Sequence, residues 1–208
     1  MFDFSLLSIV ASLPGLIIAM VLHEYAHARV AVAMGDFTPR LAGRLTLNPA
    51  KHIDPIGMVC LFLVHFGWAK PVMINPYNFK DPKWDDIKVS LAGPAANFLV
   101  AFVAAVVFAA LVKFTGTPSQ GMVYVFSYII IININFGIFN LLPIPPLDGS
   151  HVLVQLLPYD LARKVEGLQR YSLIILLVLM MTPILGMVLV PLQKFILSIF
   201  DFIIGFMF

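Results

Sequence analysis

The chain has 208 residues, of which 61% are hydrophobic and only 12% charged, with a formal net charge of +2. A soluble domain carries roughly 25% charged residues, so this composition excludes an ordinary soluble protein and predicts a polytopic membrane protein. The charges are scattered, which gives no sign of nucleic-acid binding. The single cysteine excludes an intrachain disulfide and a zinc site built on several cysteines.

The first predicted element is a transmembrane helix over residues 4–34. The chain start lacks the basic residues of a signal peptide, so we expect this apolar run to remain as a span. No Lys or Arg precedes Arg29, whereas several follow it closely. Because positive residues favour the cytoplasmic side, we expect the C-terminal end of this helix to face the cytoplasm.

The same end of the helix carries His23-Glu24-Tyr25-Ala26-His27. Residues i and i+4 lie on one face of a helix, so the two imidazoles can hold one zinc ion with the glutamate beside the metal's water. Two imidazoles and a carboxylate are costly at the edge of an apolar run, which favours a functional reason for their presence.

Residues 36–49 follow, and in them polar residues alternate with leucines. The alternation predicts a small membrane-associated strand or hairpin, with an edge strand at residues 40–47 beside the active site. An ordinary cytoplasmic loop is the alternative. Residues 56–68 are apolar but too few for a straight crossing, which favours a re-entrant or interfacial segment. Residues 69–86, rich in Pro and Asn, are predicted to form a loop.

Two further transmembrane helices are predicted over residues 87–114 and 119–142. The first contains Ala92-Gly93-Pro94-Ala95-Ala96-Asn97, in which small residues permit close packing and the proline can kink the helix. The second runs into Pro143-Ile144-Pro145-Pro146-Leu147-Asp148-Gly149. These prolines cannot continue a regular helix, so we expect an irregular backbone that is buried in protein or lines a wet cavity.

The C-terminal part has a polar stretch over residues 150–170 and an apolar region over residues 171–208. As one helix the apolar region would be about 57 Å long, well beyond a bilayer core of about 30 Å. We therefore expect a helical hairpin of two spans that turns at residues 183–186 or at residues 190–191. With the core at residues 4–154, it would form one membrane-embedded domain over residues 1–208.

A catalytic zinc site needs a third protein ligand, because three ligands and a water are the usual set. The chain has only two glutamates, and Glu166 lies in a basic polar stretch where a solvated role is the better interpretation. Asp148 has the best context, since it ends a long uncharged run where an unpaired carboxylate is costly. Alternatively, Asp148 caps the next helix and faces water. Weaker candidates, whose roles stay open, are Asp54, His52, His65 and His151.

These segments resemble the site-2 protease family of intramembrane zinc metalloproteases, in its compact prokaryotic branch without PDZ or CBS domains. The HExxH motif alone is moderately specific, whereas its combination with the stretch from Asn140 to Gly149 on membrane segments is highly specific. The resemblance covers about residues 6–154. It implies a core of three transmembrane helices and one zinc ion per chain held by His23, His27 and Asp148. It also implies Glu24 as the catalytic base and Asn140 in the active site.

The function so implied is hydrolysis of peptide bonds in or near transmembrane segments of membrane proteins. The enzyme would be a multi-pass protein of the cell membrane with its active site toward the cytoplasmic side. A substrate helix must be extended before attack, and the edge of the strand predicted at residues 40–47 could receive it. The bilayer and a transmembrane substrate are the expected partners, with no nucleic acid, and the sequence does not predict the oligomeric state.

Two alternatives belong to other functional classes. A metal-binding membrane transporter would use the same buried side chains, but it does not explain Glu24 between the two histidines. A non-catalytic membrane scaffold would carry the motif as a relic and bind no zinc.

Overall fold

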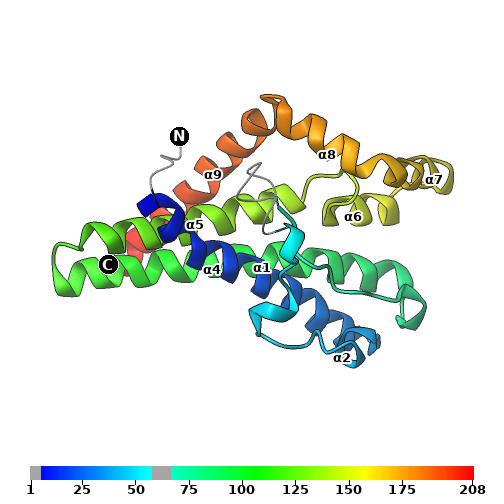
Figure 1. Ribbon diagram of the computed structural model, residues 1–208, viewed down its shortest axis with the longest axis horizontal. Helices are drawn as coiled ribbons and strands as arrows, with labels where there is room; N and C mark the ends of the chain where they lie inside the picture. The colour runs from blue at the N-terminus through cyan, green and yellow to red at the C-terminus, as the bar shows by residue number, and fades with distance from the viewer. Residues whose placement is uncertain (1–5, 58–66) are drawn as a thin grey trace.

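The computed structural model describes residues 6–57 and 67–208, and most of them are helical. Within this part of the chain four helices are long and apolar enough to cross a membrane: α1 (Leu6–Met34), α4 (Pro82–Thr115), α5 (Gln120–Asn140) and α9 (Ile184–Met207). Figure 1 shows α4 and α5 running along the long axis of the molecule, with α1 lying obliquely against them. The prediction of a helical, multi-pass membrane protein is therefore confirmed.

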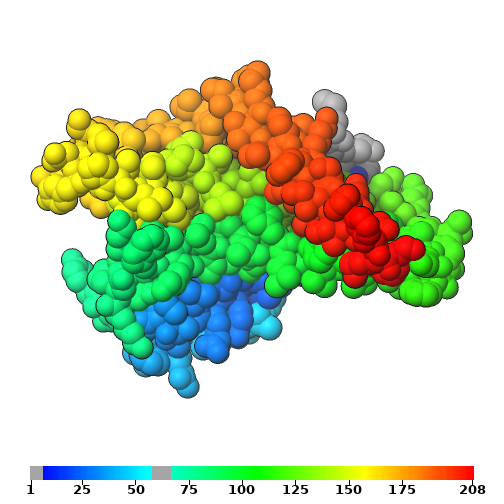
Figure 2. All heavy atoms as spheres, turned by 180° about the vertical axis from the view of Figure 1, so that it is seen from behind, coloured from blue at the N-terminus to red at the C-terminus, as the bar shows by residue number. Residues whose placement is uncertain are grey.

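The spacing of the three central helices depends on small residues. Gly15 of α1 lies so close to α5 that a Cβ added to it would be 3.0 Å from the Tyr128 carbonyl oxygen. Small residues permit such close approach between membrane helices. A buried apolar cluster joins α4 and α5 to α9 and consists of Ala101, Ile134, Ile138 and Phe200. Seen from behind, α9 lies across α4 and α5 (Figure 2).

Helix α4 begins at Pro82, earlier than the predicted start at residue 87. The Asp81 carboxylate accepts a hydrogen bond from Trp84 N at 3.2 Å, and Pro82 occupies the first turn. Both features favour a helix start. Hydropathy marks the apolar span rather than the whole helix, so the prediction omitted this polar first turn.

The strand predicted at residues 40–47 is wrong. The structure has the short helix α2 (Thr38–Leu41) followed by turns, and the described residues contain no sheet. Pro39 lies in the first turn of α2, where a proline is well tolerated, and Gly43 has a φ of 68°. Leu41 is 86% exposed, so the alternating leucines share no buried face. Alternation without a buried face specifies no strand register.

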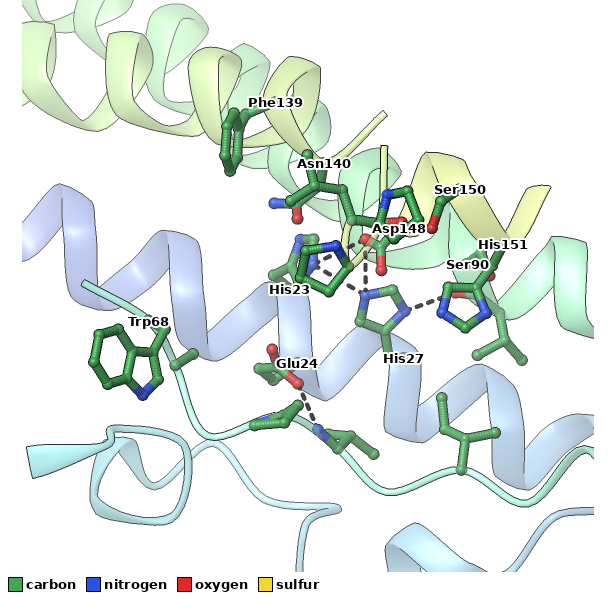
Figure 3. A pocket seen from close by; sticks show the side chains of 18 of the residues that line it. His23, Glu24, His27, Trp68, Ser90, Phe139, Asn140, Asp148, Ser150 and His151 are labelled. Carbon is green, nitrogen blue, oxygen red and sulfur yellow. Dashed lines mark hydrogen bonds and ion pairs between the residues drawn. The ribbon is translucent and has the colours of Figure 1, made fainter. Parts of the chain in front are cut away.

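The re-entrant segment predicted at residues 56–68 lies mostly outside the described residues, and so does His65. The two flanks of this segment meet through an isolated antiparallel bridge between Ile53 and Ala69. Beyond the bridge, residues 70–75 have no regular secondary structure, in agreement with the predicted loop. This stretch runs alongside α1 (Figure 3).

The C-terminal part contains α6 (Asp148–Leu156), α7 (Tyr159–Gly167) and α8 (Ser172–Met181), which lead to α9. The chain breaks between α8 and α9 at Thr182 and Pro183, close to the first of the two predicted turns, while Pro191 lies within α9. Helix α8 has ten residues and a length of about 15 Å, half of a bilayer core of about 30 Å. Of the predicted pair of C-terminal spans, only α9 is long enough to cross.

We expect Gly15→Val to separate α1 from α5, because the new side chain would collide with the Tyr128 backbone. Overpacking of this kind costs about 1–3 kcal/mol, so thermal unfolding in detergent should begin several degrees lower. Gly205→Val is the matched control, since a Cβ added at Gly205 would meet no atom within 4 Å apart from its chain neighbours and the nearby backbone of its own helix. Equal losses in the two variants would contradict the close approach.

Candidate active site

Two histidines of α1 and the first residue of α6 bring three ligand atoms to one point. The Nε2 atoms of His23 and His27 are 3.0 Å apart, and each lies 3.2 Å from Asp148 Oδ2. In a tetrahedral zinc site with bonds of about 2.0–2.1 Å, neighbouring ligand atoms are roughly 3.3–3.4 Å apart. The triangle therefore has nearly the size of one face of a zinc tetrahedron. Figure 3 shows the three side chains converging.

The hydrogen bonds around the histidines fix which ring nitrogen faces this point. The Nδ1 atom of His27 lies 2.7 Å from the Val89 carbonyl oxygen, which can only accept, so Nδ1 carries the proton. In a neutral imidazole Nε2 then presents a lone pair. Asp148 Oδ2 is buried and has no hydrogen-bond donor among the described residues. Lone pairs and a carboxylate oxygen directed at one point repel one another, and a bound cation removes the repulsion, so the residues fit zinc.

His23 is oriented by two buried asparagines. Its Nδ1 donates to Asn97 Oδ1 at 2.7 Å, and Asn97 Nδ2 donates to the Ala19 carbonyl at 3.0 Å and to Asn133 Oδ1 at 3.1 Å. The Ala19 carbonyl can only accept, which fixes the orientation of the Asn97 amide. The network joins α1, α4 and α5 and satisfies polar groups that have no access to water. Such outer partners fix the tautomer and ring position of a metal-binding histidine.

Gly93 of α4 lies directly against the two imidazoles. A Cβ added there would be 2.4 Å from His27 Nε2 and 2.5 Å from His23 Cε1. Any side chain at this position would push the histidines apart or displace α4. The sequence predicted close packing around Gly93, but it did not indicate that the glycine faces the histidines.

Glu24 lies between the two histidines on α1 and is 9% exposed. Its Oε2 accepts a hydrogen bond from the Val72 backbone N–H at 2.9 Å. The donor belongs to the non-helical segment at residues 67–75, which reaches the site from outside the three central helices. One carboxylate oxygen is thereby held, and the other can face the metal site.

The three candidate ligands and Glu24 line a cavity of about 830 Å³ between the central helices, residues 67–76 and the start of α6. Asn140 also lines this cavity, and Figure 3 shows it near His23. Its amide nitrogen donates to the Phe136 carbonyl at 2.9 Å, which uses one of its two N–H groups. The structure thus brings all five predicted site residues to one cavity.

The weaker candidates do not join the ligand triangle. His52 is buried, and its Nε2 lies 2.7 Å from the Thr46 carbonyl oxygen. Asp54 accepts hydrogen bonds from Gly57 N and Ile56 N, which hold the pKa of its carboxyl below the ordinary value.

Two further candidates lie in the C-terminal part of the chain. His151 is exposed at the cavity wall. Glu166 is exposed, as its basic polar surroundings predicted.

Sequence reasoning assigned no role to Asn97, Asn133 or Val72. The two asparagines carry a signal, because amides inside apolar spans need hydrogen-bond partners. The sequence alone does not say which partners they find. Val72 acts through its backbone N–H, which no side-chain pattern reveals.

The chain matches a family model described as "Peptidase family M50" over residues 109–182, which include Asn140 and Asp148. It is 39% identical over 180 residues to the "Putative zinc metalloprotease YwhC" of Bacillus subtilis, covering 85% of this chain and 82% of that protein. It is 30% identical over 178 residues to the "Putative zinc metalloprotease Rip2" of Mycolicibacterium smegmatis, covering 83% of this chain and 67% of the relative. A protein of the same name from Mycobacterium tuberculosis is 28% identical over 179 residues, with the same coverage of both chains. No solved structure matches the chain significantly.

We expect Asn97→Ala to lower zinc affinity about 10–100-fold, because His23 Nδ1 loses its acceptor and the imidazole can rotate or change tautomer. Competition with a chelator of known affinity measures the change. Asn135→Ala is the control, since Asn135 Oδ1 has no hydrogen-bond partner among the described residues. Unchanged affinity in Asn97→Ala, or an equal loss in both variants, would contradict this role.

Gly93→Ala should reduce the zinc content of the purified protein, because the new methyl group would lie where the two imidazoles are. Ala95→Leu adds a larger group to the same helix at an exposed position and should retain zinc. Metal analysis of both proteins tests the difference. Full zinc occupancy in Gly93→Ala would show that α4 can move away from the histidines.

Proposed function

The chain belongs to peptidase family M50, and we propose that His23, His27 and Asp148 hold its catalytic zinc while Glu24 is the catalytic base. It is an intramembrane zinc metalloprotease, and the alternative of a membrane transporter is not favoured by these relationships. The observation that carries the residue assignment is the ligand triangle with sides of 3.0–3.2 Å next to a buried glutamate.

His23, His27 and Asp148 would hold the zinc, which would supply a more acidic water and polarise the carbonyl of the bond to be cut. Glu24 then takes a proton from the attacking water as the new C–O bond forms, and it delivers a proton to the departing amine as the C–N bond breaks. The Val72 N–H holds Glu24 Oε2, so Oε1 is the oxygen that exchanges protons.

Asn140 is proposed to bind the peptide at the reacting bond. Its amide keeps one N–H after donating to the Phe136 carbonyl, and it lines the same cavity as the ligands. A neutral donor there can hydrogen-bond the carbonyl oxygen that gains charge during attack.

The proposed substrate is a transmembrane segment of a membrane protein. A helix uses its carbonyls internally, so the segment must be extended at the bond to be cut. Because the strand predicted at residues 40–47 does not exist, residues 67–75 are the better place for an extended substrate. They line the cavity and lie against Glu24, and backbone pairing with them would require no particular sequence.

We further propose one membrane-embedded domain in the cell membrane with the active site on the cytoplasmic side. Most Lys and Arg residues flank the end of the helix bundle that holds the histidines, including Arg29, Lys80 and Arg163. At the opposite end, near the turn from α4 to α5, stands Lys113. This distribution follows the preference of positive residues for the cytoplasm.

Glu24→Gln should keep its zinc but lose at least about 100-fold in cleavage of single-span membrane proteins in liposomes, because the amide cannot take a proton. His23→Ala should lose zinc as well. Asp160→Asn, an exposed carboxylate on α7, should behave as wild type. Cleavage retained in Glu24→Gln would refute the catalytic assignment, and metal transport retained without cleavage would favour a transporter.

A further inference from the structure

Residues 44–57, called the bracket from here on, form a compact unit that the proposed chemistry does not use. The His52 imidazole donates to the Thr46 carbonyl at 2.7 Å, and Asn48 Oδ1 accepts from Ala50 N at 3.0 Å. Asp54 Oδ1 accepts from Ile56 N at 2.8 Å. These side-chain-to-backbone bonds, together with the short 3-10 helix at Pro49–Lys51, define the shape of the bracket.

Arg44 is the first residue of the bracket, and its side chain is buried, with 7% exposed. Its guanidinium donates to the Lys51 carbonyl inside the bracket and to the Lys70 and Pro71 carbonyls across from it, at 3.3 and 3.4 Å. No carboxylate pairs with it in the part of the chain that the structure describes. Burying a cation without an ionic partner is costly, which favours a positional role for this side chain.

Three other contacts hold the same stretch of chain against the bracket. Lys70 N donates to the His52 carbonyl at 2.7 Å, and Ile53 forms the antiparallel bridge to Ala69. Gly57 is so close to Trp68 that an added Cβ would be 2.2 Å from the Trp68 carbonyl oxygen. Residues 68–71 are therefore fixed on the side away from α1.

The peptide unit between Pro71 and Val72 connects the bracket to the active site. Arg44 holds its carbonyl oxygen, and Glu24 Oε2 accepts from its N–H at 2.9 Å. A peptide unit is rigid and planar, so its C=O and N–H cannot be turned separately. Fixing the carbonyl with Arg44 consequently fixes the direction of the N–H that holds the Glu24 carboxylate.

We propose that Arg44 is a positioning residue for proteolysis, which orients the Glu24 carboxylate through the Pro71–Val72 peptide unit. The inference rests on the proposed role of Glu24 as base. Under this proposal, zinc binding and the orientation of the base depend on different parts of the chain. The proposed zinc ligands come from α1 and α6, while the base is oriented from the bracket. Loss of Arg44 should therefore reduce turnover without releasing zinc.

The first test compares Arg44→Gln with Arg40→Gln, a change of an exposed arginine of α2 that also removes one positive charge. We expect Arg44→Gln to keep its zinc and lower kcat about 10–100-fold, because a catalytic group displaced by about 1 Å costs up to that factor. Arg44→Lys should fall between, since an ammonium group cannot reproduce the guanidinium fork. Hydrogen exchange of residues 67–75 should become faster in Arg44→Gln only.

The second test acts on the peptide unit itself and does not depend on how well an arginine variant folds. Val72→Pro removes the N–H, whereas Val72→Ala keeps it. We expect Val72→Pro to keep zinc and to lose kcat by a factor similar to Arg44→Gln, at least about tenfold more than Val72→Ala loses, because only the proline variant lacks the N–H. Because both changes break one chain of contacts, the double variant Arg44→Gln/Val72→Pro should lose no more than Val72→Pro alone.

Three results would overturn the proposal: full activity in Val72→Pro, equal loss in Arg44→Gln and Arg40→Gln, or loss of zinc in Arg44→Gln. The last result would assign Arg44 to overall folding. Glu24→Gln, measured in parallel, separates the two levels of the argument. If Glu24→Gln cleaves normally, the catalytic assignment of Glu24 fails. If Glu24→Gln is inactive but Val72→Pro is active, only the positioning role fails.

Discussion

The close approach of the two imidazoles at the Gly93 surface is the constraint on which the rest of this structure depends. His23 Nε2 and His27 Nε2 can lie 3.0 Å apart because Gly93 leaves room for both rings. Helix α4 contributes no metal ligand, yet it provides an acceptor for each Nδ1, through Asn97 Oδ1 and the Val89 carbonyl. The position of α4 therefore determines both the spacing and the tautomers of the histidines on α1.

This arrangement explains why buried polar side chains gather next to His23 in the otherwise apolar interior of the protein. Asn97 and Asn133 are fully buried, and an unsatisfied amide in such surroundings costs several kcal/mol. Their hydrogen bonds to each other, to His23 and to the Ala19 carbonyl satisfy these groups and tie three helices together. The network that orients His23 thus also fixes the relative positions of α1, α4 and α5.

Sequence reasoning predicts most of the site and least of the surrounding backbone. Helical spacing indicates that His23 and His27 share a face, and the shortage of glutamates makes Asp148 the leading candidate for a third ligand, while the complete ligand set is what the family resemblance implies. The helices follow from hydropathy. The prediction of a strand at residues 40–47 was wrong. It treated Arg44 as a residue of the polar, exposed face, whereas the Arg44 side chain is buried and donates hydrogen bonds to distant backbone carbonyls. Contacts made by backbone atoms, such as the Val72 N–H, leave no trace in the side-chain pattern.

The division between helices and loop follows from what each group must do. A metal ligand, as we propose Asp148 to be, has to stay in place through the reaction. Asp148 is the first residue of α6, where Gly149 allows an approach so close that an added Cβ would be 2.2 Å from the Leu141 carbonyl oxygen. A substrate segment needs accessible backbone, which a helix does not offer because its own hydrogen bonds use it. Residues 67–75, the proposed binding segment, have no regular secondary structure, and the bracket holds them through Ala69 and Lys70. Glu24, the proposed base, lies on the same helix as the two histidines and accepts a hydrogen bond from the loop. If Glu24 is the base, the position of the loop relative to α1 decides whether its carboxylate faces the proton donor.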